Sequence, residues 1–159
     1  MKHFSSYIPK YFSLVTGKAE GNTKLTAFDN ALLSANVGDY NIVKVSSIIP
    51  PGCVFMSDYK IEPGSIVYCA YGFIICNLPG EIISSAVAVG VSNDYEIESG
   101  LIMEYSSKCI KTVSEEKVKS MVVEGMTYRK KDIKDILFTS SEHEVKKIGA
   151  VFSGVLLWG

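Results

Sequence analysis

Runs of apolar, β-branched and aromatic residues dominate the hydrophobic pattern of the chain, and short polar or turn-forming segments separate them. Side chains of these types pack well on a pleated surface, so such runs favour strands. On this pattern, strands are expected at residues 11–16, 41–49, 66–78, 82–91, 101–105, 133–139 and 145–158.

The turn-forming residues between the runs predict how the strands connect. Pro79-Gly80 separates the run at 66–78 from the run at 82–91, and this dipeptide favours a tight turn. The two runs are therefore interpreted as a hairpin. The polar residues 140–144 are expected to join the last two strands.

Two segments follow helical spacing instead. In residues 25–35 the apolar side chains recur close to every third or fourth position, and residues 114–126 carry an apolar stripe. Ser114 is expected to cap the second helix. Many strands with two separated helices predict an α+β fold, an αββα sandwich in which helices cover antiparallel sheets.

Length and composition restrict the class of protein. A chain of 159 residues fits one domain, residues 1–159, and 47% hydrophobic with 21% charged residues is typical of a folded globular protein. The net charge of −1 and the interspersed charges provide no basic surface. Binding to nucleic acid or to an anionic membrane is therefore not expected.

The chain shows no sign of export or membrane insertion. Its start lacks the apolar core of a signal peptide, and polar residues interrupt the apolar segment at 145–158. The four cysteines, Cys53, Cys69, Cys76 and Cys109, form no CxxC pair. Free thiols in a reducing cytoplasm are expected, with no metal site.

The dipeptide Ser46-Ser47 ends the run at 41–49, just before Pro50-Pro51. Taken alone, this pair of serines would be interpreted as part of a turn. Other segments, in the same order along the chain, complete a more specific pattern. They are residues 23–33 (TKLTAFDNALL), 70–75 (AYGFII), 78–81 (LPGE), 100–105 (GLIMEY), 149–152 (GAVF) and 157–158 (LW).

From about residue 11 to residue 158, the chain resembles the pyruvoyl-dependent arginine decarboxylase family. The resemblance implies that the Ser47 hydroxyl attacks the carbonyl carbon of Ser46 and converts the peptide bond into an ester. β-Elimination would then release a beta chain, residues 1–46, and leave an alpha chain, residues 47–159. The new end, a dehydroalanine, would hydrolyse to a covalent pyruvoyl cofactor derived from Ser47.

The resemblance also implies the reaction and its residues. The pyruvoyl group would form a Schiff base with L-arginine and release CO2, giving agmatine. Asn41 would stabilise the oxyanion during cleavage, Glu104 would donate a proton, and Asp29 would bind the guanidinium group. Without the resemblance, Glu104 would be an exposed residue paired with Lys108 or a cross-strand lysine, and Asp29 a solvated helix residue.

Strand geometry sets a condition on Asn41. On a straight strand Asn41 and Ser47 would share a face but lie roughly 20 Å apart. Asn41 can assist only if the chain bends sharply or if it comes from a neighbouring subunit. The resemblance implies a homo-oligomer, a trimer with its sites at subunit interfaces.

Two alternatives remain open for the function. Departures from the family pattern at Asp39-Tyr40 and at residues 52–62 leave room for another amino-acid substrate, such as ornithine, lysine or aspartate. The other alternative is a non-catalytic trimeric homologue that is never cleaved. The retention of Asn41, Glu104 and both serines argues against it.

Overall fold

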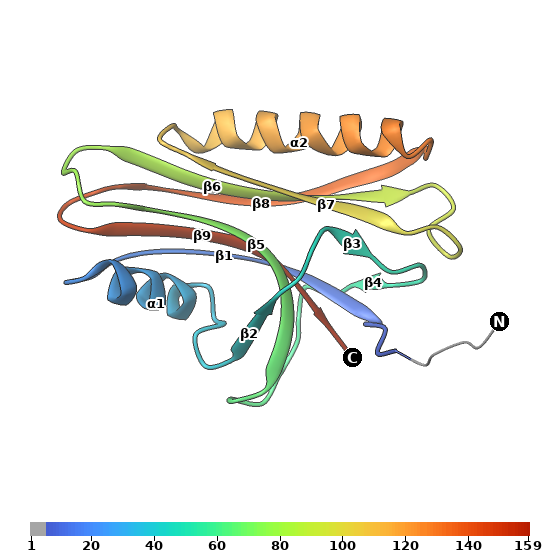
Figure 1. The fold of residues 1–159 in the computed structure, drawn as a ribbon, viewed down its shortest axis with the longest axis horizontal. Coiled ribbons are helices and arrows are strands. Elements are labelled where there is room, and N and C mark those ends of the chain that lie inside the picture. The colour runs from blue at the N-terminus through green and yellow to red at the C-terminus, as the bar shows by residue number, and fades with distance from the viewer. Residues whose placement is uncertain (1–5) are drawn as a thin grey trace.

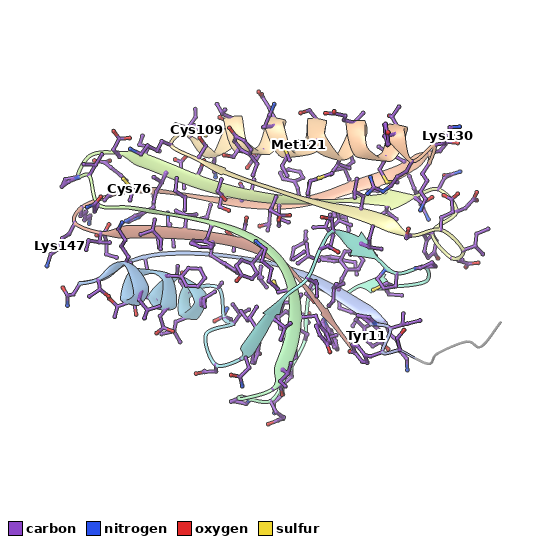
Figure 2. All side chains as sticks on the ribbon, viewed as in Figure 1. Tyr11, Cys76, Cys109, Met121, Lys130 and Lys147 are labelled. Atoms are coloured by element: carbon purple, nitrogen blue, oxygen red, sulfur yellow. The ribbon has the colours of Figure 1, made fainter. Side chains whose placement is uncertain are left out.

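The computed structural model of the protein describes residues 6–159, and Figure 1 shows a four-layer arrangement of helix, sheet, sheet and helix. This confirms the predicted αββα sandwich. Residues 1–5 lie outside the described residues. They belong to the start of the chain, which was noted above to lack the apolar core of a signal peptide. Side chains fill the space between the two sheets and beneath α2 (Lys111–Tyr128) (Figure 2).

One sheet has five strands in the order β2-β5-β9-β1-β4. Its centre is antiparallel, and β1 pairs with β9 at ten positions, from Tyr11 opposite Trp158 to Glu20 opposite Gly149. The two short edge strands pair in parallel with their neighbours. The strands are β1 (Tyr11–Glu20), β2 (Asn41–Lys44), β4 (Val54–Phe55), β5 (Ile66–Cys76) and β9 (Gly149–Trp158).

The other sheet has four antiparallel strands in the order β3-β7-β6-β8. Its strands are β3 (Ile48–Ile49), β6 (Ile82–Ser92), β7 (Gly100–Ser107) and β8 (Ile133–Glu144). Phe12, Val155 and Leu157 of the five-stranded sheet pack against Val87 and Ile102 of this sheet. The apolar core between the layers therefore holds the two sheets face to face.

A helix covers the outer face of each sheet. α1 (Lys24–Ser34) begins at a capping box between Thr23 and Thr26, and its buried residues Ala27 and Ala31 pack on the five-stranded sheet. α2 packs on the four-stranded sheet through Val118, Val122 and Met126.

The structure corrects two of the predicted connections. Residues 41–49 are not one strand: β2 belongs to the five-stranded sheet and β3 to the four-stranded sheet. The strands on either side of Pro79-Gly80 also lie in different sheets, so they do not form a hairpin. In both places the chain crosses from one layer to the other, and strand periodicity carries no signal for such a crossing.

Two local predictions were also wrong. α2 begins at Lys111 after Ile110, and Ser114 lies buried inside the helix, with its hydroxyl 2.7 Å from that of Ser84. Residues 140–144 are part of β8 and pair with β6. Their polar side chains suggested a loop, yet a strand at the edge of a sheet tolerates such residues.

Candidate functional site

Residues 45–47, here called the crossing segment, carry the chain from β2 to β3 and contain the dipeptide Ser46-Ser47. At its start, the Val45 amide donates a hydrogen bond to the Cys69 carbonyl in β5, at 3.1 Å. At its end, the Ile102 amide in β7 donates to the Ser47 carbonyl, at 2.7 Å. The peptide between the two serines therefore lies between an anchor on one sheet and an anchor on the other.

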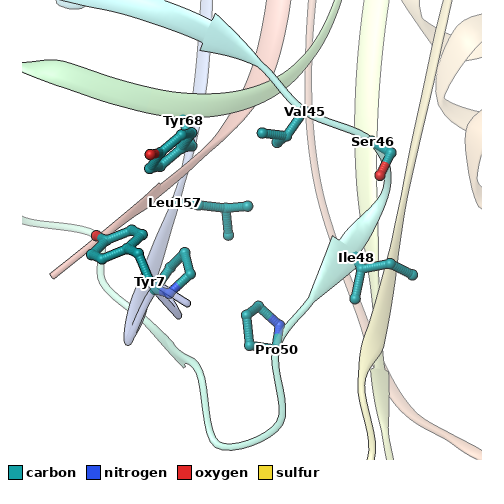
Figure 3. A pocket seen from close by; sticks show the side chains of 8 residues that line it. Tyr7, Val45, Ser46, Ile48, Pro50, Tyr68 and Leu157 are labelled. Atoms are coloured by element: carbon teal, nitrogen blue, oxygen red, sulfur yellow. The ribbon is translucent and has the colours of Figure 1, made fainter. Parts of the chain in front are cut away.

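A pocket of about 350 Å³ opens beside the crossing segment (Figure 3). Its lining is mostly apolar and aromatic, and Ser46 stands at its rim. The rings of Tyr7 and Tyr68 lie 5.5 Å apart on one wall. Burial, with a smaller effect of Tyr68, raises the pKa of Tyr7. The lining residues are Tyr7, Pro9, Val45, Ser46, Ile48, Pro50, Tyr68 and Leu157.

Glu104 lies on β7, two residues beyond the Ile102 amide that holds Ser47. Alternate residues of a strand share a face, so Glu104 points with Ile102 into the space between the sheets, roughly 7 Å further along the strand. Burial raises the pKa of its carboxyl group, and the Lys44 ammonium offsets part of this effect. The environment therefore favours the protonated acid that a proton donor requires.

Close approach of the sheets defines the space around Glu104. A methyl group placed on Gly72 of β5 would lie 3.2 Å from Cβ and Cγ of Glu104 and 3.0 Å from the Ser106 hydroxyl. Ser106 is hydrogen-bonded to Ser85 of β6, which in turn contacts Ser153 of β9. A residue without a side chain at position 72 thus leaves room for Glu104 and Ser106.

The other two expected site residues lie elsewhere in the chain. Asn41 is exposed at the start of β2, and its Nδ2 donates to the Gly64 carbonyl at 2.8 Å. Asp29 is exposed on α1, which covers the outer face of the five-stranded sheet (Figure 1). That sheet separates Asp29 from Glu104. A single chain therefore brings together Ser46, Ser47 and Glu104 but not Asn41 or Asp29.

The estimate of 20 Å between Asn41 and Ser47 assumed one straight strand, and the break between β2 and β3 removes that assumption. Glu104 does not form the ion pair with Lys108 that was the alternative to a catalytic role. The Lys108 ammonium lies 3.9 Å from Glu81 instead.

Sequence reasoning missed two groups near Glu104. Lys44 is close enough to lower the pKa of Glu104, although its Nζ lies over the Tyr71 ring, 4.7 Å from the ring centre, on the side of the five-stranded sheet that faces α1. The hydroxyl cluster of Ser85, Ser106 and Ser153 is the other. Serines inside otherwise apolar strands were the available signal, because buried hydroxyl groups need partners.

Two features are absent from the part of the chain that the structure describes. Within residues 6–159, no group of three or more His, Cys, Asp and Glu side chains is arranged to hold a metal ion. In the same part of the chain, no helix combines the length and the apolar character needed to cross a membrane.

Comparison with known proteins identifies relatives along almost the whole chain. The family model for pyruvoyl-dependent arginine decarboxylase matches residues 11–154. A protein of that name from Methanocaldococcus jannaschii is 41% identical over 151 residues, which cover 95% of this chain and 91% of the relative. One from Pyrococcus furiosus is 40% identical over 153 residues, covering 94% of this chain and 96% of the relative.

A solved structure supports the fold independently. Pyruvoyl-dependent histidine decarboxylase, determined at pH 8, aligns with a TM-score of 0.53 over 62% of this chain and 53% of that protein. At 15% identity this likeness concerns the fold alone. The sequence relatives and the family match place the chain, over its whole sandwich, in the pyruvoyl-dependent arginine decarboxylase family.

Proposed function

We propose that the chain cleaves itself between Ser46 and Ser47 and that the cleaved protein converts L-arginine to agmatine and CO2. One observation carries the proposal. The peptide to be cleaved lies in the crossing segment, outside both strand ladders, and its Ser47 end is held by the Ile102 amide of β7, two residues before Glu104.

Cleavage requires the Ser47 hydroxyl to reach the Ser46 carbonyl carbon. The attack breaks the C–N bond, forms an ester and transfers the hydroxyl proton to the nitrogen. Loss of the Ser47 α-proton then expels Ser46 as a carboxylate, and water releases ammonia from the dehydroalanine. A segment outside the ladders can bend for this attack without disrupting strand pairing, which supports the assignment.

The surroundings of Ser47 fit a small electrophilic group. Ser47 lies between two residues that line the pocket, Ser46 and Ile48, so a substrate amine in the pocket would be close to it. A pyruvoyl group at this position supplies a ketone and an electron sink for the charge left when CO2 departs. Glu104 then donates its proton to the carbon that lost CO2. Its partly buried setting raises the pKa of the carboxyl group and so favours the form that carries the proton.

A complete site needs groups from a second chain. Asp29 has the chemistry to bind a guanidinium group through two parallel hydrogen bonds, and Asn41 has a side-chain amide. Both residues are exposed, and the five-stranded sheet separates Asp29 from Glu104 of the same chain. We infer that a neighbouring subunit supplies them, in a trimer with sites at its interfaces.

Two further points complete the proposal. The names of the relatives favour arginine over other amino acids. All four cysteines are free thiols, and three of them are buried, which supports a location in the reducing cytoplasm.

Intact-mass measurement tests the cleavage. We expect fragments of residues 1–46 and 47–159, the second blocked at its amino end, and an uncleaved Ser47→Ala variant. A single unbroken species after long incubation of the wild type would contradict the proposal and favour the non-catalytic alternative.

CO2 release from a panel of amino acids tests the reaction, and Glu104→Gln is the matched variant. We expect Glu104→Gln to cleave normally but to lose activity by roughly a hundredfold or more. Co-expression of Glu104→Gln with Asp29→Asn tests shared sites. Recovery of activity in mixed oligomers is expected, and its absence would place Asp29 and Glu104 in unrelated sites.

A further inference from the structure

Two tyrosine rings, from Tyr7 and Tyr68, form the wall of the pocket that lies across from Ser46 (Figure 3). The ring centres are 5.5 Å apart and the ring planes are tilted by 34°. Tyr7 is 56% exposed and Tyr68 is half-buried. The pair therefore keeps aromatic surface that a ligand in the pocket can contact.

Both rings are carried by anchored backbone. The Tyr7 hydroxyl donates a hydrogen bond to the Gly159 carbonyl at 3.3 Å. Three residues further along the chain, the Lys10 amide donates to the Trp158 carbonyl at 3.1 Å. Tyr68 belongs to β5 itself. Cleavage between the two serines would leave one ring in each of the resulting chains.

The part of the pocket lining that the structure describes carries no charged side chain. An aspartate side chain would bring an unpaired carboxylate into this lining, at a large cost in free energy. The side chain of lysine or ornithine would bring a compact ammonium group, whose strong hydration the lining cannot replace. Cleavage would add a carboxylate at Ser46, which again favours a cation over aspartate.

The guanidinium group of arginine differs from an ammonium group in two ways that suit this wall. It is more weakly hydrated, and its flat face stacks on aromatic rings. Stacking leaves the edge of the group, with its N–H donors, free to bind a carboxylate such as that of Asp29 from a neighbouring subunit.

We propose that Tyr7 and Tyr68 form a stacking wall for the guanidinium group of the substrate, and that this wall makes the site selective for arginine over lysine and ornithine. The role of the wall in catalysis rests on the proposed function, but its affinity for a guanidinium group needs neither cleavage nor decarboxylation.

Binding of two probes to uncleavable Ser47→Ala protein tests the wall. Butylguanidinium carries the cation on an aliphatic chain, and butylurea is a neutral molecule of nearly the same shape. Titrations followed by NMR measure both affinities, and the tyrosine ring signals show where each probe binds. We expect butylguanidinium to bind more tightly. The Tyr68→Leu variant should lose about threefold to tenfold of this preference, as for a partly exposed cation–π contact.

Three further variants complete the test. Tyr68→Phe keeps an aromatic face and should keep the preference. Tyr7→Leu changes an exposed side chain, so it gives an answer even if Tyr68→Leu fails to fold, and it should reduce the preference in the same way. Tyr128→Leu removes a tyrosine of α2 that is 90% exposed and does not line this pocket, so it should leave both affinities unchanged.

Equal affinity of the Ser47→Ala protein for the two probes, or an unchanged preference in either folded leucine variant, would overturn the proposal. In the cleavable protein, both leucine variants should raise KM for arginine by about the same factor as they weaken butylguanidinium binding. Decarboxylation of arginine with an unchanged KM in these variants would contradict the wall and leave the proposed function intact. The expected probe binding without any decarboxylation would refute the proposed function and leave the wall intact.

Discussion

Replacing Gly72 by alanine should impair the chemistry of Glu104 while leaving the fold and the cleavage reaction in place. The new methyl group would lie 3.2 Å from Cβ and Cγ of Glu104 and 3.0 Å from Ser106 Oγ. Contacts of this kind are most favourable at about 3.5–4.0 Å. The Glu104 side chain must therefore move by about half an ångström, and a displacement of that order costs about tenfold to a hundredfold in rate.

Stability should hardly change in Gly72→Ala. Overpacking costs about 1 kcal/mol where the neighbours are side chains that can yield, and alanine recovers about 0.4–1 kcal/mol by restricting the unfolded chain. The midpoint of thermal unfolding should therefore stay within about 2–4 °C of the wild type.

Three measurements separate these effects: thermal unfolding, intact mass for cleavage, and kcat from CO2 release. The double variant Gly72→Ala with Glu104→Gln is the decisive control. If alanine acts through Glu104, it should cause little further loss once the carboxyl group is gone. A normal kcat in folded Gly72→Ala, or losses that simply multiply in the double variant, would refute this reasoning.

Three further predictions concern the ends of the sandwich and the substrate. Burial raises the pKa of Glu20, but hydrogen bonds from the amides of residues 146–148 and from His143 outweigh it and lower the pKa from 4.5 to about 2. The stabilisation of the fold by the Glu20 carboxylate is therefore complete above pH 4.5 and is lost as the pH falls through about 2. The thermal unfolding midpoints of wild type and Glu20→Gln should differ at pH 7 and converge in acid. A difference between the two midpoints that stays the same at every pH would contradict this. Asp29→Asn should raise KM for arginine about tenfold or more with intact cleavage, and an unchanged KM would remove Asp29 from the site. After cleavage both fragments should elute together in native size exclusion and separate only in denaturant, because β1 pairs with β9 at ten positions; separation without denaturant would show that this pairing is insufficient.

The sequence was sufficient to predict the layers of the fold, because apolar runs and helical stripes report local burial. It did not indicate which strands pair. The run at 66–78 and the run at 82–91 were correctly predicted as strands, yet they lie in different sheets. The sequence of a Pro-Gly turn does not indicate whether the chain returns within the same sheet or crosses to the facing sheet.

The site was predictable in part for a similar reason. Ser46, Ser47 and Glu104 were named from the family resemblance, and the structure brings them together through the register of β3 and β7. Ser85 and Ser153 come from distant parts of the chain, and only the facing of the two sheets makes them neighbours of Ser106. Asn41 and Asp29 are exposed on the surface of one chain, so the role proposed for them requires a second chain to bring them to the site.

The crossing segment is also a site at which the chain could be circularly permuted. Tyr11 pairs with Trp158, and the Lys10 amide donates to the Trp158 carbonyl at 3.1 Å, so the start of β1 adjoins the end of β9. A short linker from residue 159 to residue 6 would give a circular permutant that begins at Ser47 and ends at Ser46. It would keep the strand pairing of the cleaved molecule but carry serine at its first position. Assembly of the sandwich could then be studied apart from formation of the cofactor.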